Sequence, residues 1–215
     1  MSVNVKTPLA FAAATLAAAL LLANKTQAYV TNGVTWGVVP AVYSINTTNL
    51  DLPDASVETA VRAGADVWAT QSGANVGFAY AGRSTQTTNT NDGINLVVFR
   101  NASSGSAIAT TYWWSSGSHI IDADIVFWDG AFQFFAGSTG CSNGFYIEDI
   151  AAHEFGHALG LGHSTSPAAT MYPSTASCDM RNRTLDADDI AGVLALYPPS
   201  SPPPLPPANV RIIGN

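Results

Sequence analysis

The chain has 215 residues, of which 47% are hydrophobic and only 11% are charged, and its formal net charge at pH 7 is −7. This length and apolar content suit one globular domain with a single core. An acidic surface repels phosphate groups, so the charge argues against nucleic acid or an anionic membrane as a partner.

The first 28 residues have the pattern of an export signal. A weakly basic start at Lys6 precedes an apolar run over residues 9–23, and small residues follow up to Ala28. We therefore expect a signal peptide at 1–28, cleaved after Ala28, and a secreted, extracellular or periplasmic protein that is not attached to a membrane. The apolar run is shorter than the roughly 20 residues that span a bilayer. A retained membrane anchor is the alternative.

Residues 29–198 are predicted to form one α+β domain, because strand-like and helix-like apolar patterns alternate along them. The expected strands are residues 42–45, 75–80, 94–99, 107–113 and 121–127, which makes a sheet of about five strands. The expected helices are one through Val57, Val61, Gly64, Val67 and Trp68, one at about 147–159 and one at 186–197. A polar Thr/Asn stretch at 84–92 predicts a mobile loop.

Residues 199–215 form a proline-rich tail. Its first part predicts a stiff polyproline spacer, and a strand-like segment at 210–213 follows. We expect a disordered extension. Docking on the domain or on a partner's groove are the alternatives.

Eleven residues, from His153 to His163, carry most of the chemistry. They read H-E-x-x-H-x-x-G-x-x-H, the pattern of a zinc-dependent endopeptidase. Residues four apart share one face of a helix, so His153 and His157 can bind one ion, and Glu154 can reach a water that the ion activates. His163 requires the helix to end and the chain to turn back, which Gly160 permits. Three imidazoles leave one position of a tetrahedral zinc open for catalysis.

Chance is a poor explanation of this pattern. With average amino-acid composition, the full motif would occur by chance in about one chain of this length in a hundred thousand. Only four histidines occur in the chain, and three of them lie in the motif. A single histidine packed in a core is common, but it does not account for this cluster.

Cys141 and Cys178 are the only cysteines, and an even count in an exported chain favours one disulfide. The bond would join the loop before the zinc helix to the loop after Met171. Two free thiols and zinc ligation are the alternatives.

The residues after His163 resemble those of the matrixins, the family of the matrix metalloproteinases. Ser164 follows the third histidine, and Met171-Tyr172-Pro173 is similar to that family's methionine turn. Residues 124–127 and 185–197 also resemble matrixins, especially the short bacterial members. The resemblance implies a metzincin-like α+β fold, with a twisted, mostly parallel sheet, an antiparallel edge strand, a zinc helix and a C-terminal helix.

The resemblance also implies roles for individual residues. Zinc would be bound by His153, His157 and His163, with Glu154 as general base. Met171 would lie beneath the imidazoles, and Asp188 and Asp189 would tie the last helix to the methionine turn and to the mature N-terminus. Solvated helix charges are the simpler interpretation of the two aspartates. A polypeptide substrate would lie along the edge strand and beside a specificity pocket, in contact with Ile108, Ala109, Thr110, Tyr172 and Pro173.

Several matrixin features are not matched here. No cysteine precedes Cys141, so the cysteine switch of animal matrixins is not expected, and His119 alone cannot build their second, structural zinc site. Calcium is left open, because Asp122 and Asp124 match acidic positions but Ile125 stands where a glutamate is expected.

The sequence therefore predicts a monomeric, secreted zinc metalloendopeptidase. A binding protein that is catalytically silent, or an enzyme specific for one partner, is the alternative.

Overall fold

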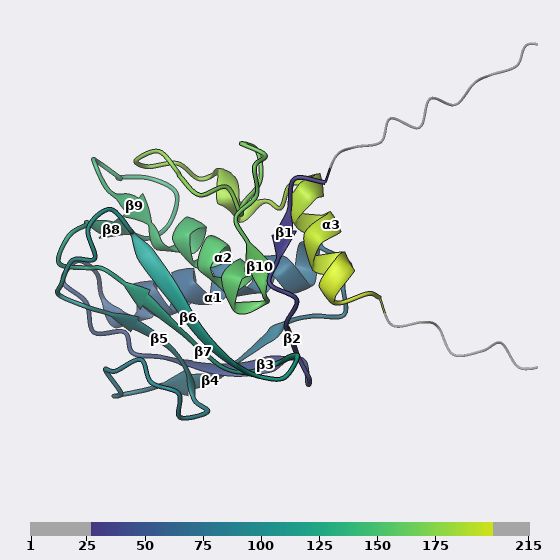
Figure 1. Ribbon diagram of the computed structural model, residues 1–215. Coiled ribbons are helices and arrows are strands. Elements are labelled where there is room, and N and C mark those ends of the chain that lie inside the picture. The colour runs from purple at the N-terminus through teal and green to yellow at the C-terminus, as the bar shows by residue number, and fades with distance from the viewer. Residues whose placement is uncertain (1–26, 200–215) are drawn as a thin grey trace, which may run out of the picture.

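The computed structural model describes residues 27–199, so most of the predicted signal peptide and of the proline-rich tail lie outside the described residues. One twisted sheet carries the helices α1 and α2 (Figure 1). Within residues 27–199, no helix is both long and apolar enough to cross a membrane.

The five predicted strands all form, and they make up the main sheet together with one short strand. In chain order the six strands are β2 (Thr35–Trp36), β3 (Ala41–Ile45), β4 (Phe78–Arg83), β5 (Asn95–Phe99), β6 (Ala109–Ser116) and β7 (His119–Phe127). Strands β4, β3, β5 and β7 lie in that order and are parallel, with β2 parallel to the start of β7. β6 pairs with β7 in the antiparallel sense and forms an edge of the sheet. This confirms the predicted α+β architecture.

Two helices cover one face of this sheet, α1 (Asp54–Gln71) and α2 (Ile147–Ala158). The core between them includes Trp68 from α1, Phe155 from α2, and alternate residues of β3, β5 and β7. The helices cross closely at Gly64, where an added Cβ would lie 2.6 Å from the Cβ of Ala151 and 2.7 Å from the main-chain N of Ala152. Only glycine lets α1 approach α2 this closely, and this contact sets the position of α2 above the sheet.

Shorter elements complete the domain around α2. They are β1 (Val30–Thr31), β8 (Phe134–Phe135), β9 (Phe145–Tyr146), β10 (Leu161–Gly162), the 3-10 helix η1 (Arg181–Arg183) and α3 (Ala187–Leu196). β1 pairs antiparallel with β10, and β8 pairs parallel with β9. The helix α3 begins with a capping box, in which the side chains of Asp186 and Asp189 accept from main-chain N–H groups.

The loop that was expected to be mobile is tied to β7 by two buried carboxylates. Asp122 accepts from the main-chain N–H groups of Asp92 and Gly93, at 2.7 and 2.8 Å. Asp124 accepts from those of Thr90 and Leu96, both at 2.9 Å. Three of the four carboxylate oxygens therefore accept hydrogen bonds, and Oδ1 of Asp122 is buried without a partner in the described residues.

Candidate active site

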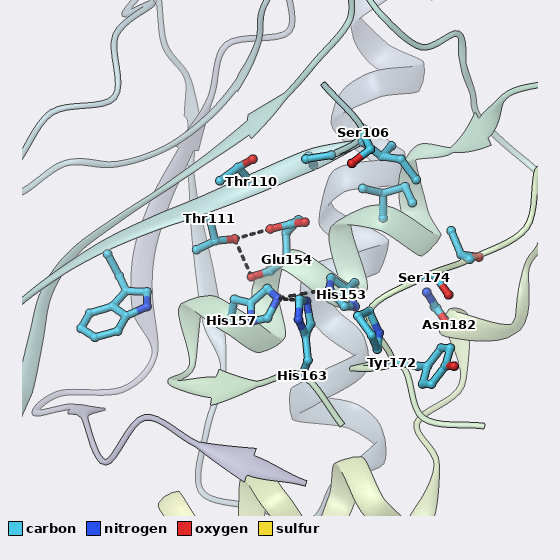
Figure 2. Close-up of a pocket in the computed structure, with 17 residues that line it drawn as sticks. Ser106, Thr110, Thr111, His153, Glu154, His157, His163, Tyr172, Ser174 and Asn182 are labelled. Atoms are coloured by element: carbon cyan, nitrogen blue, oxygen red, sulfur yellow. Dashed lines mark hydrogen bonds between the residues drawn. The ribbon is translucent and has the colours of Figure 1, made fainter. Parts of the chain in front are cut away.

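The three motif histidines meet at the end of α2 (Figure 2). His153 and His157 lie one turn apart on this helix, which ends at Ala158. Gly160 has a φ of +93°, in the left-handed region that favours glycine, and the chain reverses there into β10. His163 follows directly. The Nε2 atom of His157 lies 3.1 Å from that of His153 and 3.2 Å from that of His163.

The surroundings of these rings make the Nε2 atoms suitable metal ligands. The Nδ1 of His153 lies 2.7 Å from the carbonyl oxygen of Thr170, and the Nδ1 of His157 lies 2.8 Å from that of Leu161. Because a carbonyl can only accept, each Nδ1 carries the proton and each Nε2 presents a lone pair. Burial lowers the pKa of both histidines to about 4, so both rings are neutral at pH 7.

Lone pairs converging at this distance repel one another unless a cation lies between them. Tetrahedral zinc with Zn–N bonds of about 2.05 Å separates its nitrogen ligands by about 3.3 Å. The observed separations of 3.1 and 3.2 Å are close to that value. In the described part of the chain, no other group of three or more His, Cys, Asp or Glu side chains is arranged to hold a metal. The donor set therefore fits zinc.

Glu154 lies beside this cluster and is 5% exposed. Its Oε2 accepts a hydrogen bond of 2.6 Å from the hydroxyl of Thr111 on β6. Burial raises the pKa of Glu154, and this is only partly opposed by His157 and by the hydrogen bond from Thr111. A carboxylate with a raised pKa next to a metal site is suited to accept and return a proton.

Met171 and Asp189 lie beside the segment that contacts His153. Met171 is buried beneath α2, where Gly156 leaves room for its sulfur and for the Trp68 ring. Asp189 accepts from the main-chain N–H groups of Thr170, at 2.7 Å, and of Met171, at 3.0 Å. Since the carbonyl of Thr170 also accepts from His153, Asp189 fixes the segment that orients the His153 ring.

Asp188 joins α3 to the beginning of the described chain. Its Oδ1 accepts from the main-chain N–H groups of Ala28 and Tyr29, both at 3.0 Å, and its Oδ2 accepts from the hydroxyl of Ser164 at 2.6 Å. Ser164 directly follows His163. One carboxylate therefore holds the predicted mature N-terminus and the residue that follows the third histidine.

A pocket of about 380 Å³ opens beside the histidines. Its walls come from β6 and the residues before it, from α2, from the segment after Met171 and from η1. All five residues predicted to contact substrate line it, namely Ile108, Ala109, Thr110, Tyr172 and Pro173. The outer edge of β6 pairs with no strand of the described chain, so its main-chain groups are free to pair with an extended peptide.

Comparison with known proteins identifies the family. A model of the matrixin family matches residues 35–198. This chain belongs to the matrixins. Matrixins are zinc metalloendopeptidases, in agreement with the histidine cluster and Glu154.

Several matrix metalloproteinases are similar to part of this matrixin domain. Matrix metalloproteinase-20 of Homo sapiens is 52% identical over 58 residues, which are 27% of this chain and 12% of that protein. Neutrophil collagenase of Homo sapiens is 48% identical over 65 residues, 30% of this chain and 14% of that protein. Metalloendoproteinase 1-MMP of Arabidopsis thaliana is 52% identical over 58 residues, 25% of this chain and 15% of that protein. The similarity thus spans less than one sixth of the length of each relative.

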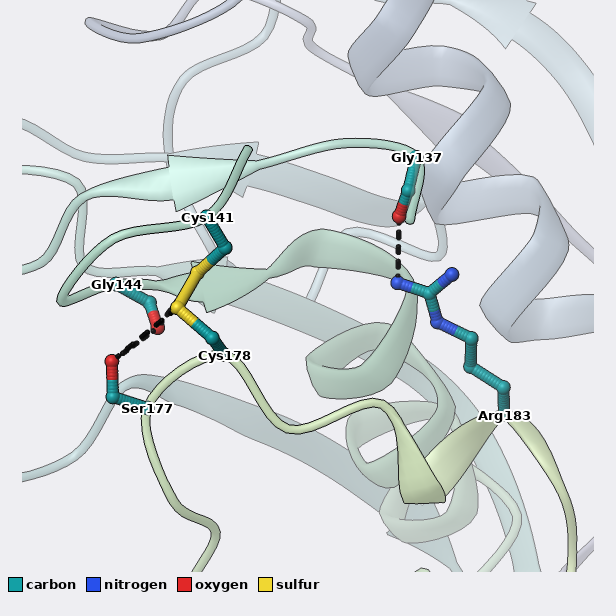
Figure 3. The surroundings of a disulfide bond; sticks show 6 residues. All are labelled: Gly137, Cys141, Gly144, Ser177, Cys178 and Arg183. Carbon is teal, nitrogen blue, oxygen red and sulfur yellow. Dashed lines mark hydrogen bonds between the residues drawn. A yellow bond between two sulfur atoms is a disulfide. The ribbon is translucent and has the colours of Figure 1, made fainter. Parts of the chain in front are cut away.

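A disulfide joins Cys141 to Cys178, which lies three residues beyond the pocket segment 172–175 (Figure 3). It confirms the predicted pairing and joins the loop before α2 to the loop after Pro173. The main-chain N–H of Cys178 and the hydroxyl of Ser177 both donate to the carbonyl of Gly144, at 2.9 and 3.1 Å. The pocket segment is therefore anchored both covalently and by hydrogen bonds.

Three residues of this region make contacts that the sequence did not predict. Thr111 contacts Glu154 directly. Asn182 lines the pocket with its buried amide. Arg183 pairs with Asp149 of α2 at 2.7 Å and donates to the carbonyl of Gly137 at 2.8 Å (Figure 3), which connects η1 to α2 and to the loop before it. No motif marks any of them, because each acts only through a partner that is distant in the sequence.

Proposed function

We propose that this matrixin is a secreted endopeptidase that hydrolyses peptide bonds in extracellular proteins, with Glu154 as general base. One observation carries the proposal. The Nε2 atom of His157 lies within 3.2 Å of those of His153 and His163, and a carboxylate lies next to these atoms in a pocket below a free strand edge.

The substrate would lie extended along the outer edge of β6 and pair with its main chain. One substrate side chain would enter the pocket beside His153, between Ile108 and Tyr172. Zinc, held by the three histidines, would polarise the scissile carbonyl and lower the pKa of a water toward about 7. Oε1 of Glu154 would take a proton from this water as the carbonyl is attacked. Glu154 would then deliver the proton to the departing nitrogen.

Secretion is supported by two features of different kinds. The disulfide of Cys141 and Cys178 is typical of an oxidising compartment. The apolar pattern before Ala28 predicts an export signal. We propose a mature protein that begins at Tyr29, acts as a monomer on polypeptides, and is located outside the cytoplasm.

A binding protein, or an enzyme specific for one partner, is the competing function. Such a protein would normally have lost Glu154 or a zinc ligand, whereas all four residues are present. Incubation of the mature protein with a proteome-derived peptide library, with Glu154→Ala as the matched control, separates the possibilities. We expect many cleaved sequences that share a preference at one position after the cut, and none with the variant. Cleavage of no peptide by either protein would favour binding or a dedicated partner.

A further inference from the structure

Thr111 lies outside the zinc motif but forms a hydrogen bond with Glu154, the proposed general base. It lies in β6, where it pairs with Ile125 of β7. Successive side chains of a strand point to opposite faces. Thr110 therefore faces away from α2, and its hydroxyl accepts from the indole N–H of Trp128 at 2.9 Å. Thr111 faces α2, and Figure 2 shows its hydroxyl directed at Glu154.

The contact involves two atoms of Glu154. The Oγ1 of Thr111 lies 2.6 Å from the Oε2 of Glu154 and 3.0 Å from its carbonyl oxygen. When Glu154 is ionised both atoms are acceptors, so the hydroxyl donates its single proton, and the shorter distance of 2.6 Å, typical of a hydroxyl that donates to a carboxylate, assigns that proton to Oε2. Both acceptors belong to α2, so either hydrogen bond would join β6 to this helix.

The two oxygens of the Glu154 carboxylate are left in different situations. Within residues 27–199, Thr111 is the only hydrogen-bond partner of Oε2. Oε1 accepts no hydrogen bond from these residues and is not enclosed by protein. The carboxylate is thus held through Oε2, while Oε1 has no hydrogen-bond partner in the described residues.

We propose that Thr111 is a positioning residue, whose hydroxyl holds the Glu154 carboxylate in the orientation that presents Oε1 to the reacting water. This rests on the proposed function and assigns the residue that prepares its general base. The branched Cβ of threonine restricts χ1, so the hydroxyl itself has a defined direction. Removing the hydroxyl would leave a buried carboxylate with no partner, free to turn away from the pocket.

Thr111→Val tests the proposal, because valine keeps the shape and the strand preference of threonine but cannot donate. Side chains that orient groups at a metal site typically contribute about 10- to 100-fold to activity. We expect kcat on a fluorogenic peptide to fall by that factor, with KM changed by less than about threefold and with one zinc per chain retained. Thr111→Ser should restore kcat to within about threefold. Thr70→Val makes the same chemical change at an exposed site on α1 and should have no effect.

Two further measurements separate positioning from general damage. Glu154→Ala combined with Thr111→Val should be no less active than Glu154→Ala alone, because a residue that acts through Glu154 loses its effect once Glu154 is gone. A crystal structure of Thr111→Val should show the carboxylate rotated away from the zinc site. The proposal would be overturned by an unchanged kcat, by a carboxylate that has not moved, or by a loss of zinc from Thr111→Val as large as its loss of activity. If the wild-type protein cleaves nothing, the proposed function fails, and the carboxylate orientation in the two structures still tests the role of Thr111.

Discussion

Removal of the Cys141–Cys178 disulfide is expected to lower the free energy of unfolding by about 4 kcal/mol. The two cysteines are separated by 37 residues in the sequence. In the chain-entropy relation, a loop of this length restricts the unfolded chain by about 13 cal/mol/K, which is about 4 kcal/mol at 25 °C. The value is a large part of the 5–15 kcal/mol that typically stabilises a domain.

The double variant Cys141→Ser/Cys178→Ser tests this value by urea unfolding followed by tryptophan fluorescence. Ser177→Ala is the matched control, since it removes the hydrogen bond to the Gly144 carbonyl but leaves the covalent bond, and it should cost no more than about 1 kcal/mol. Because the disulfide holds the segment that follows Tyr172, KM of the double variant should rise while zinc is retained. A loss below about 1 kcal/mol in the double variant would refute the entropic argument.

Three further predictions concern stability. Gly64→Ala should destabilise the domain by about 1–3 kcal/mol in urea unfolding, because the new Cβ would lie 2.7 Å from the main-chain N of Ala152. This clash outweighs the preference of alanine for helices, which is about 1 kcal/mol. An increase in stability would contradict the close crossing of α1 and α2. Asp188→Asn should speed amide hydrogen exchange at Val30 and Thr31 and lower the free energy of unfolding by about 1–3 kcal/mol, and unchanged exchange would show that the N-terminal segment is held by other contacts. Burial raises the pKa of Asp124 to about 7, above the value of about 3.9 in an unfolded chain. The stability that protonated Asp124 contributes is therefore fully present below pH 4. It is lost as the pH rises through 7, and the free energy of unfolding falls by on the order of 2–4 kcal/mol. Asp124→Asn should therefore flatten the fall in stability between pH 4 and 7, and parallel profiles of variant and wild type would contradict the assignment.

The central elements could be predicted from the sequence because their apolar patterns are long. The strand expected at 94–99 and the helix expected at 147–159 differ from β5 and α2 by one residue at one end. The strand expected at 75–80 is instead formed by Phe78–Arg83 and follows the irregular residues 75–77. Two-residue strands such as β1 and β10 could not be predicted, since they exist only through pairing across more than a hundred residues.

The same distinction holds for the site. Helical geometry alone brings His153 and His157 together, and the glycine turn at 160 adds His163, so the proposed zinc ligands follow from spacing. The position of Thr111 does not, because two consecutive threonines on a strand face opposite ways and only the pairing of β6 with β7 decides which one meets Glu154. The roles of Asn182 and Arg183 likewise depend on how η1 packs against α2.

The most direct test of the central claim measures zinc content and casein cleavage together, for the chain from Tyr29 and for its Glu154→Ala variant. We predict one zinc per chain in both proteins, chelator-sensitive cleavage by the wild type, and a collapse of cleavage in the variant. Folded wild-type protein that binds no zinc, or equal cleavage by both proteins, would contradict the account.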